Sequence, residues 1–274
     1  MARSRTPDIQ PNKEPTDVTV NPPHVPLSDP GAWLRRFRPA PDAAVQLVCF
    51  PHAGGAASYY MPVAAALAPR IDVIAVQYPG RQDRRHEPFV EDIGALADHI
   101  HAALATCTDR PMAFFGHSMG AVTAFEVAMR LERNHGTGPV QLFVSGRRAP
   151  RTRREEAVHL RTDEGILAEL RTLSGTNEQL LQDDELVRMI MPAIRADYRA
   201  IEGYRGSESD VLGCPVTVLV GTEDPQVTAD EARLWSSHTT GPFDYREFFG
   251  GHFYLTDHQE EINALLAERL LGTA

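Results

Sequence analysis

The sequence of 274 residues has few cysteines, no excess of positive charge and no long apolar run. Its three cysteines, Cys49, Cys107 and Cys214, lie far apart and show neither a disulfide framework nor metal-ligand spacing, which favours a reducing cytosol. The net charge of −10 argues against general nucleic-acid binding. No run approaches the roughly 20 apolar residues that span a bilayer, and no apolar core follows the first arginines as in a signal peptide. We therefore expect a soluble, cytoplasmic protein that binds neither nucleic acid nor membrane.

The first thirty residues differ in composition from the rest of the chain. Residues 1–30 are rich in proline and have few large apolar side chains. Such a segment cannot bury enough surface to offset the entropy of ordering it, so we expect a disordered tail.

From Trp33 onward, apolar runs of strand length alternate with segments of helical periodicity. A short edge strand is expected near residues 33–37. Further strands are expected at 45–50, 71–76, 112–115, 140–144, 216–220 and 245–249. Helices are expected at 58–67, 93–104, 119–134, 228–237 and 257–271. Repeated strand–helix units predict an α/β fold with a mainly parallel central sheet flanked by helices.

One long segment interrupts this alternation. Residues 147–206 contain only helical patterns, at 163–173 and 184–204. We interpret the segment as a helical cap, or lid, inserted into a core formed by residues 31–146 and 207–274. The lid would cover the edge of the sheet at the carboxyl ends of the strands, where open α/β sheets bind their ligands.

A serine follows the strand expected at 112–115. The stretch Gly116-His117-Ser118-Met119-Gly120 has the G-x-S-x-G spelling of a nucleophile elbow, in which a strand delivers a serine to the start of a helix. Glycines are expected on both sides because a Cβ there would collide with the neighbouring strand or helix. Ser118 is therefore a candidate nucleophile. The alternative is a strand-to-helix turn that happens to contain serine.

A serine hydroxyl needs a base to become a nucleophile near neutral pH. His252 follows Gly250 and Gly251 between the last strand and the last helix, so it is the candidate base. His117 is expected to point away from the line of attack and to act in packing. Five other histidines lie in or at the ends of helical patterns and are expected in solvent: His99, His101, His135, His238 and His258.

The acid of a triad is expected after the strand at 216–220, to orient the histidine and stabilise its charged form. Asp224 is preferred to its neighbour Glu223 because it precedes Pro225, which suits a rigid turn. The resulting chain order, Ser118, Asp224 and His252, is that of α/β-hydrolases.

Two backbone amides are expected to stabilise the oxyanion. Met119 supplies one, directly after the nucleophile, and Ala53, in the small-residue loop Pro51-His52-Ala53-Gly54-Gly55, supplies the other. The alternative for this loop is a plain glycine turn. No stretch spells a phosphate-binding P-loop, and the proposed chemistry requires neither a metal nor a nucleotide, so we expect no cofactor.

Five motifs together resemble the type II thioesterases, stand-alone α/β-hydrolases that accompany polyketide synthases and nonribosomal peptide synthetases. They are Phe50-Pro51-His52-Ala53-Gly54-Gly55, Tyr78-Pro79-Gly80-Arg81, Gly116-His117-Ser118-Met119-Gly120, Gly221-Thr222-Glu223-Asp224-Pro225 and Gly250-Gly251-His252-Phe253. The resemblance runs from about Trp33 to the C-terminus. It implies a triad at the matching serine, aspartate and histidine, with Ala53 in the oxyanion loop. It also implies removal of stalled or aberrant acyl groups from the phosphopantetheine arm of acyl or peptidyl carrier proteins.

The expected lid and two arginine runs bear on such a substrate. The apolar side chains of the lid mostly serve packing, but part of them are expected to line a chamber for an acyl chain. Two arginine runs, at 147–154 and 84–85, are by default solvated charge, yet such patches would steer an acidic carrier domain.

Three rival functions stay open. They are an esterase or lipase acting on oxyesters, a non-catalytic α/β-hydrolase used as a binding module, and a cyclising thioesterase. Cyclising domains usually end a long synthase, so a chain this short favours hydrolysis. A monomer is favoured.

Overall fold

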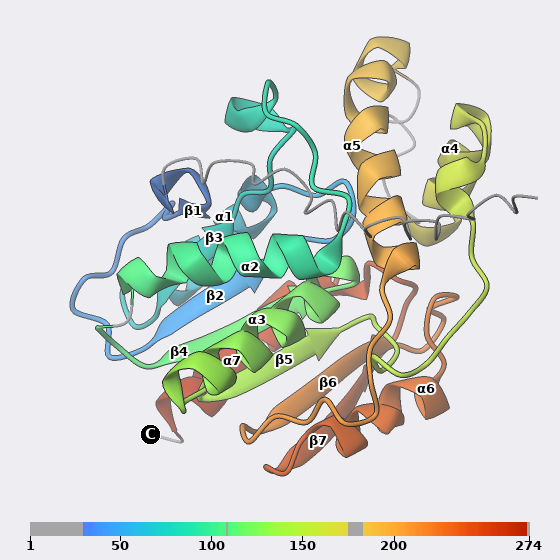
Figure 1. Ribbon diagram of the computed structural model, residues 1–274. Coiled ribbons are helices and arrows are strands. Elements are labelled where there is room, and N and C mark those ends of the chain that lie inside the picture. The colour runs from blue at the N-terminus through green and yellow to red at the C-terminus, as the bar shows by residue number, and fades with distance from the viewer. Residues whose placement is uncertain (1–29, 108, 175–182, 273–274) are drawn as a thin grey trace, which may run out of the picture.

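A seven-stranded sheet forms the centre of the molecule. The computed structural model describes residues 30–107, 109–174 and 183–272. The strands are β1 (Leu34–Arg35), β2 (Gln46–Phe50), β3 (Asp72–Val76), β4 (Met112–His117), β5 (Gln141–Ser145), β6 (Val216–Gly221) and β7 (Phe243–Phe248). Their order is β1-β3-β2-β4-β5-β6-β7 (Figure 1). Strand β1 pairs with β3 in the antiparallel sense and the other neighbours are parallel, which confirms the predicted sheet.

Helices cover both faces of this sheet. The helices are α1 (Met61–Leu67), α2 (Ile93–Leu104), α3 (Met119–His135), α4 (Asp163–Ser174), α5 (Asp184–Gly203), α6 (Ala229–Arg233) and α7 (Gln259–Leu271). Helices α2 and α3 share one apolar cluster with the strands, and α1 and α7 share the other (Figure 1). The chain therefore has the predicted α/β-hydrolase layering. None of the described helices is long and apolar enough to cross a membrane.

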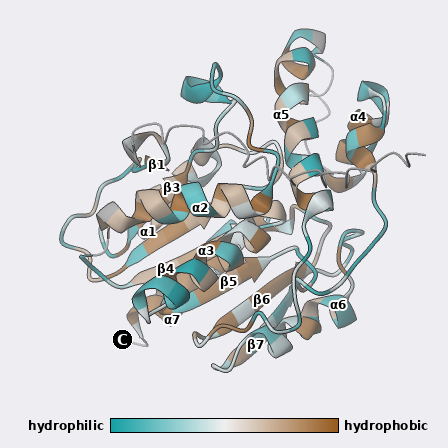
Figure 2. Cartoon of the chain, in the orientation of Figure 1, coloured by the Kyte–Doolittle hydropathy of each residue, from teal (hydrophilic) through white to brown (hydrophobic). Residues whose placement is uncertain are grey.

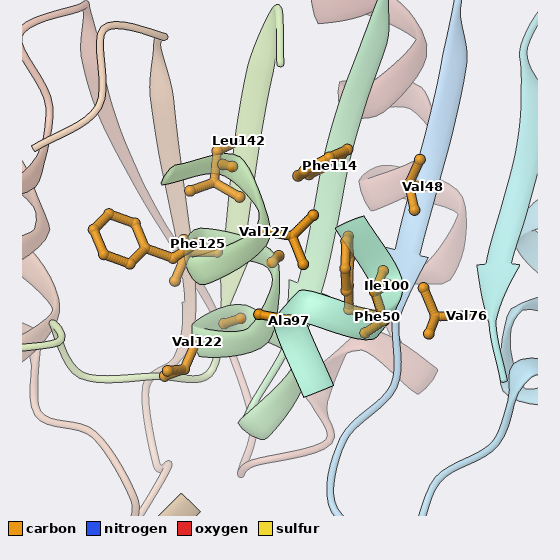
Figure 3. Close-up of a cluster of buried hydrophobic side chains, with 14 of the residues drawn as sticks. Val48, Phe50, Val76, Ala97, Ile100, Phe114, Val122, Phe125, Val127 and Leu142 are labelled. Atoms are coloured by element: carbon orange, nitrogen blue, oxygen red, sulfur yellow. The ribbon is translucent and has the colours of Figure 1, made fainter. Parts of the chain in front are cut away.

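The apolar runs of the sequence become the buried strands. Every residue of β2, β3, β5 and β6 is buried, as expected for parallel strands covered on both faces. Figure 2 shows these strands mainly in brown, whereas the outer faces of the covering helices carry more teal. Figure 3 shows side chains from the strands, such as Phe50 and Phe114, meeting Ile100 of α2 and Val127 of α3. This packing fixes where the strand ends lie.

Helices α4 and α5 lie in the chain between β5 and β6. They stand apart from the two helix layers, beyond the end of β5 (Figure 1). A small apolar cluster of their own includes Ile166 of α4 together with Val187, Met191 and Ile194 of α5. Asp183 caps the start of α5 by accepting from the backbone N–H groups of the second and third residues that follow it.

The structure bears on the predicted tail and on two of the arginines that were predicted to lie in solvent. The tail expected over residues 1–30 lies outside the described residues except for Pro30, which begins a 3-10 turn, Pro30–Ala32. Arg84 is not solvated, because its guanidinium stacks 4.2 Å from the Trp33 ring centroid and pairs with Glu87. Arg148 is likewise buried and pairs with Glu156. A planar guanidinium can satisfy its donors while its flat face packs on neighbours.

The expectation that the helix-end histidines lie in solvent is wrong for His238. Its side chain is 1% exposed, and its Nδ1 lies 2.7 Å from the carbonyl oxygen of Asp210. The ring also packs edge-on against Phe125 and Trp235. The amphipathic pattern of a short helix did not indicate this burial, because two of the partners, Asp210 and Phe125, come from distant parts of the chain.

Candidate active site

Ser118 lies at the turn between β4 and α3. Its backbone has φ 54° and ψ −119°, a strained conformation for a residue with a side chain. A Cβ on Gly116 would lie 2.2 Å from the carbonyl oxygen of Gly120, and a Cβ on Gly120 would lie 2.0 Å from that of Phe50. The Ser118 N–H donates to the carbonyl of Ser145, on β5, at 2.8 Å. The two glycines therefore allow the close backbone approach that this turn requires.

His252 and Asp224 meet beside this turn. The Nδ1 of His252 lies 2.8 Å from Oδ2 of Asp224, and the two side chains are 2% and 0% exposed. The other carboxylate oxygen, Oδ1, accepts the N–H of Gln226 at 2.8 Å. Glu223 is exposed and does not occupy this position. Because Asp224 accepts at Nδ1, the neutral imidazole keeps its Nε2 lone pair free for a proton.

His117 packs against His252, and His52 packs against His117. The ring centroid of His117 lies 4.8 Å from that of His252 and 5.9 Å from that of His52. Burial lowers the pKa of His52 from 6.5 to about 3, and it lowers the pKa of His117 well below 6.5. Both rings are therefore neutral at physiological pH, so neither repels a positive charge that develops on His252.

His117 is also part of a buried polar chain. Its Nδ1 lies 3.0 Å from Oγ of Ser145, which lies 2.6 Å from the hydroxyl of Tyr254. The sequence predicted that His117 acts in packing, and these contacts give the partners. Neither Ser145 nor Tyr254 was singled out from the sequence, because each is an ordinary residue at a strand end or in a turn.

The two amides expected for the oxyanion lie at the same cavity as the serine. A cavity of about 140 Å³ is lined by Ala53, Ser118 and Met119. Met119 is the first residue of α3, where backbone N–H groups have no partner inside the helix. The loop of Ala53 turns tightly, since the N–H of Gly55 donates to the carbonyl of His52 at 2.9 Å.

The far wall of this cavity comes from the helical segment 147–206. Val158, Leu173, Tyr198 and Ile201 supply apolar surface there. Several charged side chains at this wall are neutralised by partners: Arg161 pairs with Glu169, and Glu202 contacts His159. The space beside Ser118 is thus bounded by the core on one side and by α4 and α5 on the other.

One acidic residue near the loop that contains Ala53 was not predicted from the sequence. Asp197 of α5 is 2% exposed and accepts the N–H of Gly54 at 2.7 Å. A signal was present, because Asp197 interrupts the apolar stripe formed by Ile194 and Ile201. Among the described residues, no group of three or more histidine, cysteine, aspartate or glutamate side chains is arranged to hold a metal ion.

A serine at a strained strand-to-helix turn defines an α/β-hydrolase when a histidine and an aspartate that are hydrogen-bonded to each other follow later parallel strands, and here that histidine packs on the residue before the serine. A thioesterase-domain family model matches residues 45–269. The chain belongs to the thioesterase family.

Named relatives agree with this assignment. Thioesterase PikA5 of Streptomyces venezuelae is 50% identical over 246 residues, which cover 89% of this chain and 88% of the relative. A probable cadicidin biosynthesis thioesterase of Streptomyces griseus is 54% identical over 238 residues, which cover 87% of this chain and 66% of the relative. The structure of the type II thioesterase BorB from the borrelidin biosynthetic cluster is also similar, with a TM-score of 0.82 at 55% identity, covering 86% of this chain and 97% of that one.

Proposed function

We propose that this thioesterase releases acyl groups, stalled or aberrant ones in particular, from the phosphopantetheine arm of carrier proteins in polyketide or nonribosomal peptide biosynthesis. The observation that carries the proposal is the cavity shared by Ser118, Met119 and Ala53, together with a His252 that is hydrogen-bonded to Asp224 and packs on His117, the residue before Ser118. The names of two relatives, which refer to cadicidin and borrelidin biosynthesis, support the pathway class.

In the proposed reaction, Nε2 of His252 takes the proton of Ser118 Oγ as that oxygen attacks the thioester carbonyl carbon. The N–H groups of Met119 and Ala53 donate to the oxyanion. The carbon–sulfur bond breaks, and His252 gives its proton to the departing pantetheine sulfur. His252 then deprotonates a water molecule, which attacks the carbonyl carbon of the acyl-serine; the carbon–Oγ bond breaks, His252 returns the proton to Ser118 Oγ, and the acid is released. Asp224 holds the histidine in the required tautomer throughout.

The route of the pantetheine arm is part of the proposal. A second cavity, of about 550 Å³, adjoins the first, because Arg147, Glu156 and Ile201 line both. Arg153 and Arg154 also line it, and guanidinium groups suit the phosphate of the arm. We propose that residues 147–206 act as a lid over this path, and that the apolar wall near Ser118 receives the acyl chain.

We also propose a cytoplasmic location. The cysteines Cys49, Cys107 and Cys214 are all free thiols in the structure, as a reducing compartment would keep them. A carrier protein loaded inside the cell would then meet the enzyme directly.

The proposal is tested by comparing two substrates that share one acyl group. An acyl-phosphopantetheinyl carrier protein and a matched simple oxyester are each incubated with the enzyme, and the released acid is measured. We expect kcat/KM for the carrier protein to be higher by at least about tenfold, which is about 1.4 kcal/mol of transition-state binding.

Equal or better turnover of the oxyester would instead identify a general esterase. Absence of hydrolysis with both substrates would identify a non-catalytic module. Hydrolysis should disappear in Ser118→Ala and persist in Ser236→Ala, a control at an exposed serine.

A further inference from the structure

A buried ion pair connects helix α5 to the core next to the active-site cavity. Arg81 Nη1 donates to Oδ2 of Asp197 at 2.6 Å, and Arg81 Nη2 donates to Oδ1 at 2.8 Å. The two side chains are 9% and 3% exposed. Two parallel hydrogen bonds of this kind fix the direction of the carboxylate as well as its distance. Arg81 belongs to the Tyr78-Pro79-Gly80-Arg81 motif, for which the proposed chemistry provides no role.

The same two side chains hold the backbone of residues 51–55, which we call the oxyanion loop. Gly54 N–H donates to Asp197 Oδ2 at 2.7 Å, and Arg81 Nη1 also donates to the carbonyl of Gly55 at 3.0 Å. At the other end of the loop, the hydroxyl of Tyr78 donates to the carbonyl of Pro51 at 3.1 Å. The loop is therefore held from outside at the Pro51–His52 peptide, at the Ala53–Gly54 peptide that follows Ala53, and at the carbonyl of Gly55.

Helix α5 touches this loop closely. Gly54 has φ +76°, and a Cβ placed on it would lie 2.6 Å from Cγ1 of Ile194, one turn before Asp197 on α5. A glycine is therefore needed both for the backbone conformation and for the approach of the helix. The hydrogen bond from Gly54 to Asp197 exists only while α5 lies against the loop.

We infer that Asp197, oriented by Arg81, is a positioning residue for the oxyanion hole. It fixes the peptide group that follows Ala53 and thereby aims the Ala53 amide at the cavity of Ser118. The inference rests on the proposed function, which assigns the oxyanion to this loop. Because Asp197 lies on α5, closure of the proposed lid and assembly of the oxyanion hole are one event, and displacement of α5 would withdraw a catalytic donor.

The test compares Asp197→Ala with Asp197→Asn in the full-length enzyme acting on acyl-carrier protein. Alanine removes the acceptor for Gly54, and kcat should fall by about 10²-fold, the effect of losing one oxyanion donor. KM should change by less than about threefold, since the contact acts on the transition state. Asparagine keeps an oxygen for Gly54, so Asp197→Asn should recover a large part of the lost kcat.

A control variant separates loop positioning from general attachment of the helix. Arg199 of α5 pairs with Glu91 of the core at 2.6 Å, and this ion pair does not contact the oxyanion loop. Glu91→Gln should therefore keep the kcat of the parent enzyme within about twofold. The circular-dichroism spectrum of each variant establishes that it is folded. If Asp197→Ala does not fold, Asp197→Asn is used in its place, because this substitution keeps the volume of the side chain. Its kcat should then lie below that of Glu91→Gln.

Three results would overturn the inference. They are an unchanged kcat in folded Asp197→Ala, a loss confined to KM, and a loss in Glu91→Gln as large as that in the Asp197 variants. In each case the parent enzyme still hydrolyses acyl-carrier protein, so the proposed function stands. Absence of hydrolysis by the parent enzyme would instead defeat the proposed function, and the inference with it.

Discussion

At the scale of single residues, the carboxylate of Asp224 has both of its oxygens engaged. One faces Nδ1 of His252 at 2.8 Å and the other accepts the N–H of Gln226. Replacement by asparagine keeps the shape of the side chain but removes the charge that holds the imidazole tautomer. We expect Asp224→Asn to lower kcat by about 10⁴-fold, by analogy with other triads.

The matched control for Asp224→Asn is its exposed neighbour. Glu223→Gln makes the same chemical change one residue earlier and should leave kcat unchanged. Steady-state hydrolysis of an acyl thioester measures both variants. A loss in Glu223→Gln that exceeds the loss in Asp224→Asn would show that the acid has been assigned to the wrong residue.

The buried, neutral histidines His52 and His117 make the free energy of unfolding depend on pH. Burial lowers the folded-state pKa of His52 to about 3 and that of His117 well below 6.5, whereas in the unfolded chain each titrates near 6.5. Below about pH 6.5 the unfolded chain therefore binds more protons than the folded one, and stability falls as the pH falls. Each histidine contributes a slope of about 1.4 kcal/mol per pH unit in this range.

We therefore expect His117→Gln to reduce the loss of stability between pH 6 and pH 5 by about 1 kcal/mol, because the unfolded histidine is not yet fully protonated at pH 6. Urea unfolding at pH 7, 6 and 5 measures the free energy of unfolding. The exposed His86→Gln is the matched control. A loss on acidification as steep in His117→Gln as in the parent protein would contradict the account of a buried neutral imidazole.

At the scale of elements, much of the fold follows from the sequence. Parallel strands buried on both faces occur in the sequence as continuous apolar runs. The expected bounds of β2 and β6 therefore differ from the observed bounds by at most one residue. Helix α2 was expected at the bounds it has, and α3 ends at His135, one residue beyond the expected bound, where Gly136 has φ 71°. These signals are local, and local signals can be read from a chain without its structure.

The bounds that were missed depend on tertiary contacts. The helix expected at 58–67 begins as a 3-10 turn, Ala57–Tyr60, and becomes α-helical only at Met61. Tyr60, in that turn, donates its hydroxyl to the carbonyl of Phe50, which draws the turn onto β2. The helix expected at 228–237 likewise divides into α6 and the 3-10 segment Leu234–His238.

The candidate site likewise contains residues that the sequence predicts and residues whose roles depend on tertiary contacts. Ser118, Asp224 and His252 could be named because the carboxyl ends of parallel strands meet at one edge, so motifs placed after those strands come together. The apolar stripe of α5 marks Asp197 as an exception, but its role could not be predicted, because that role depends on Arg81, 116 residues earlier in the chain. The His52–His117 contact is of the same kind, since it joins the loop after β2 to the last residue of β4.

At the scale of the whole molecule, the core and the helical segment 147–206 each form one side of the active-site cavity. The core supplies Ser118, His252 and both expected oxyanion amides, and α4 and α5 supply the opposite wall of the cavity. The molecule carries a net charge of −10, so the arginines of the second cavity are a local exception to its charge. An acidic carrier protein would be repelled by most of the surface and attracted there, which directs its arm toward the serine.

The central claim is that Ser118 carries the acyl group during turnover. The enzyme is mixed with excess acyl-phosphopantetheinyl carrier protein, and the reaction is quenched in acid within milliseconds. The protein is then digested, and the masses of the peptides are measured by mass spectrometry. We predict an acyl adduct on the peptide that contains Ser118 and none on the same peptide of Ser118→Ala. An adduct on another residue, or release of acid by Ser118→Ala at the rate of the parent enzyme, would contradict the account.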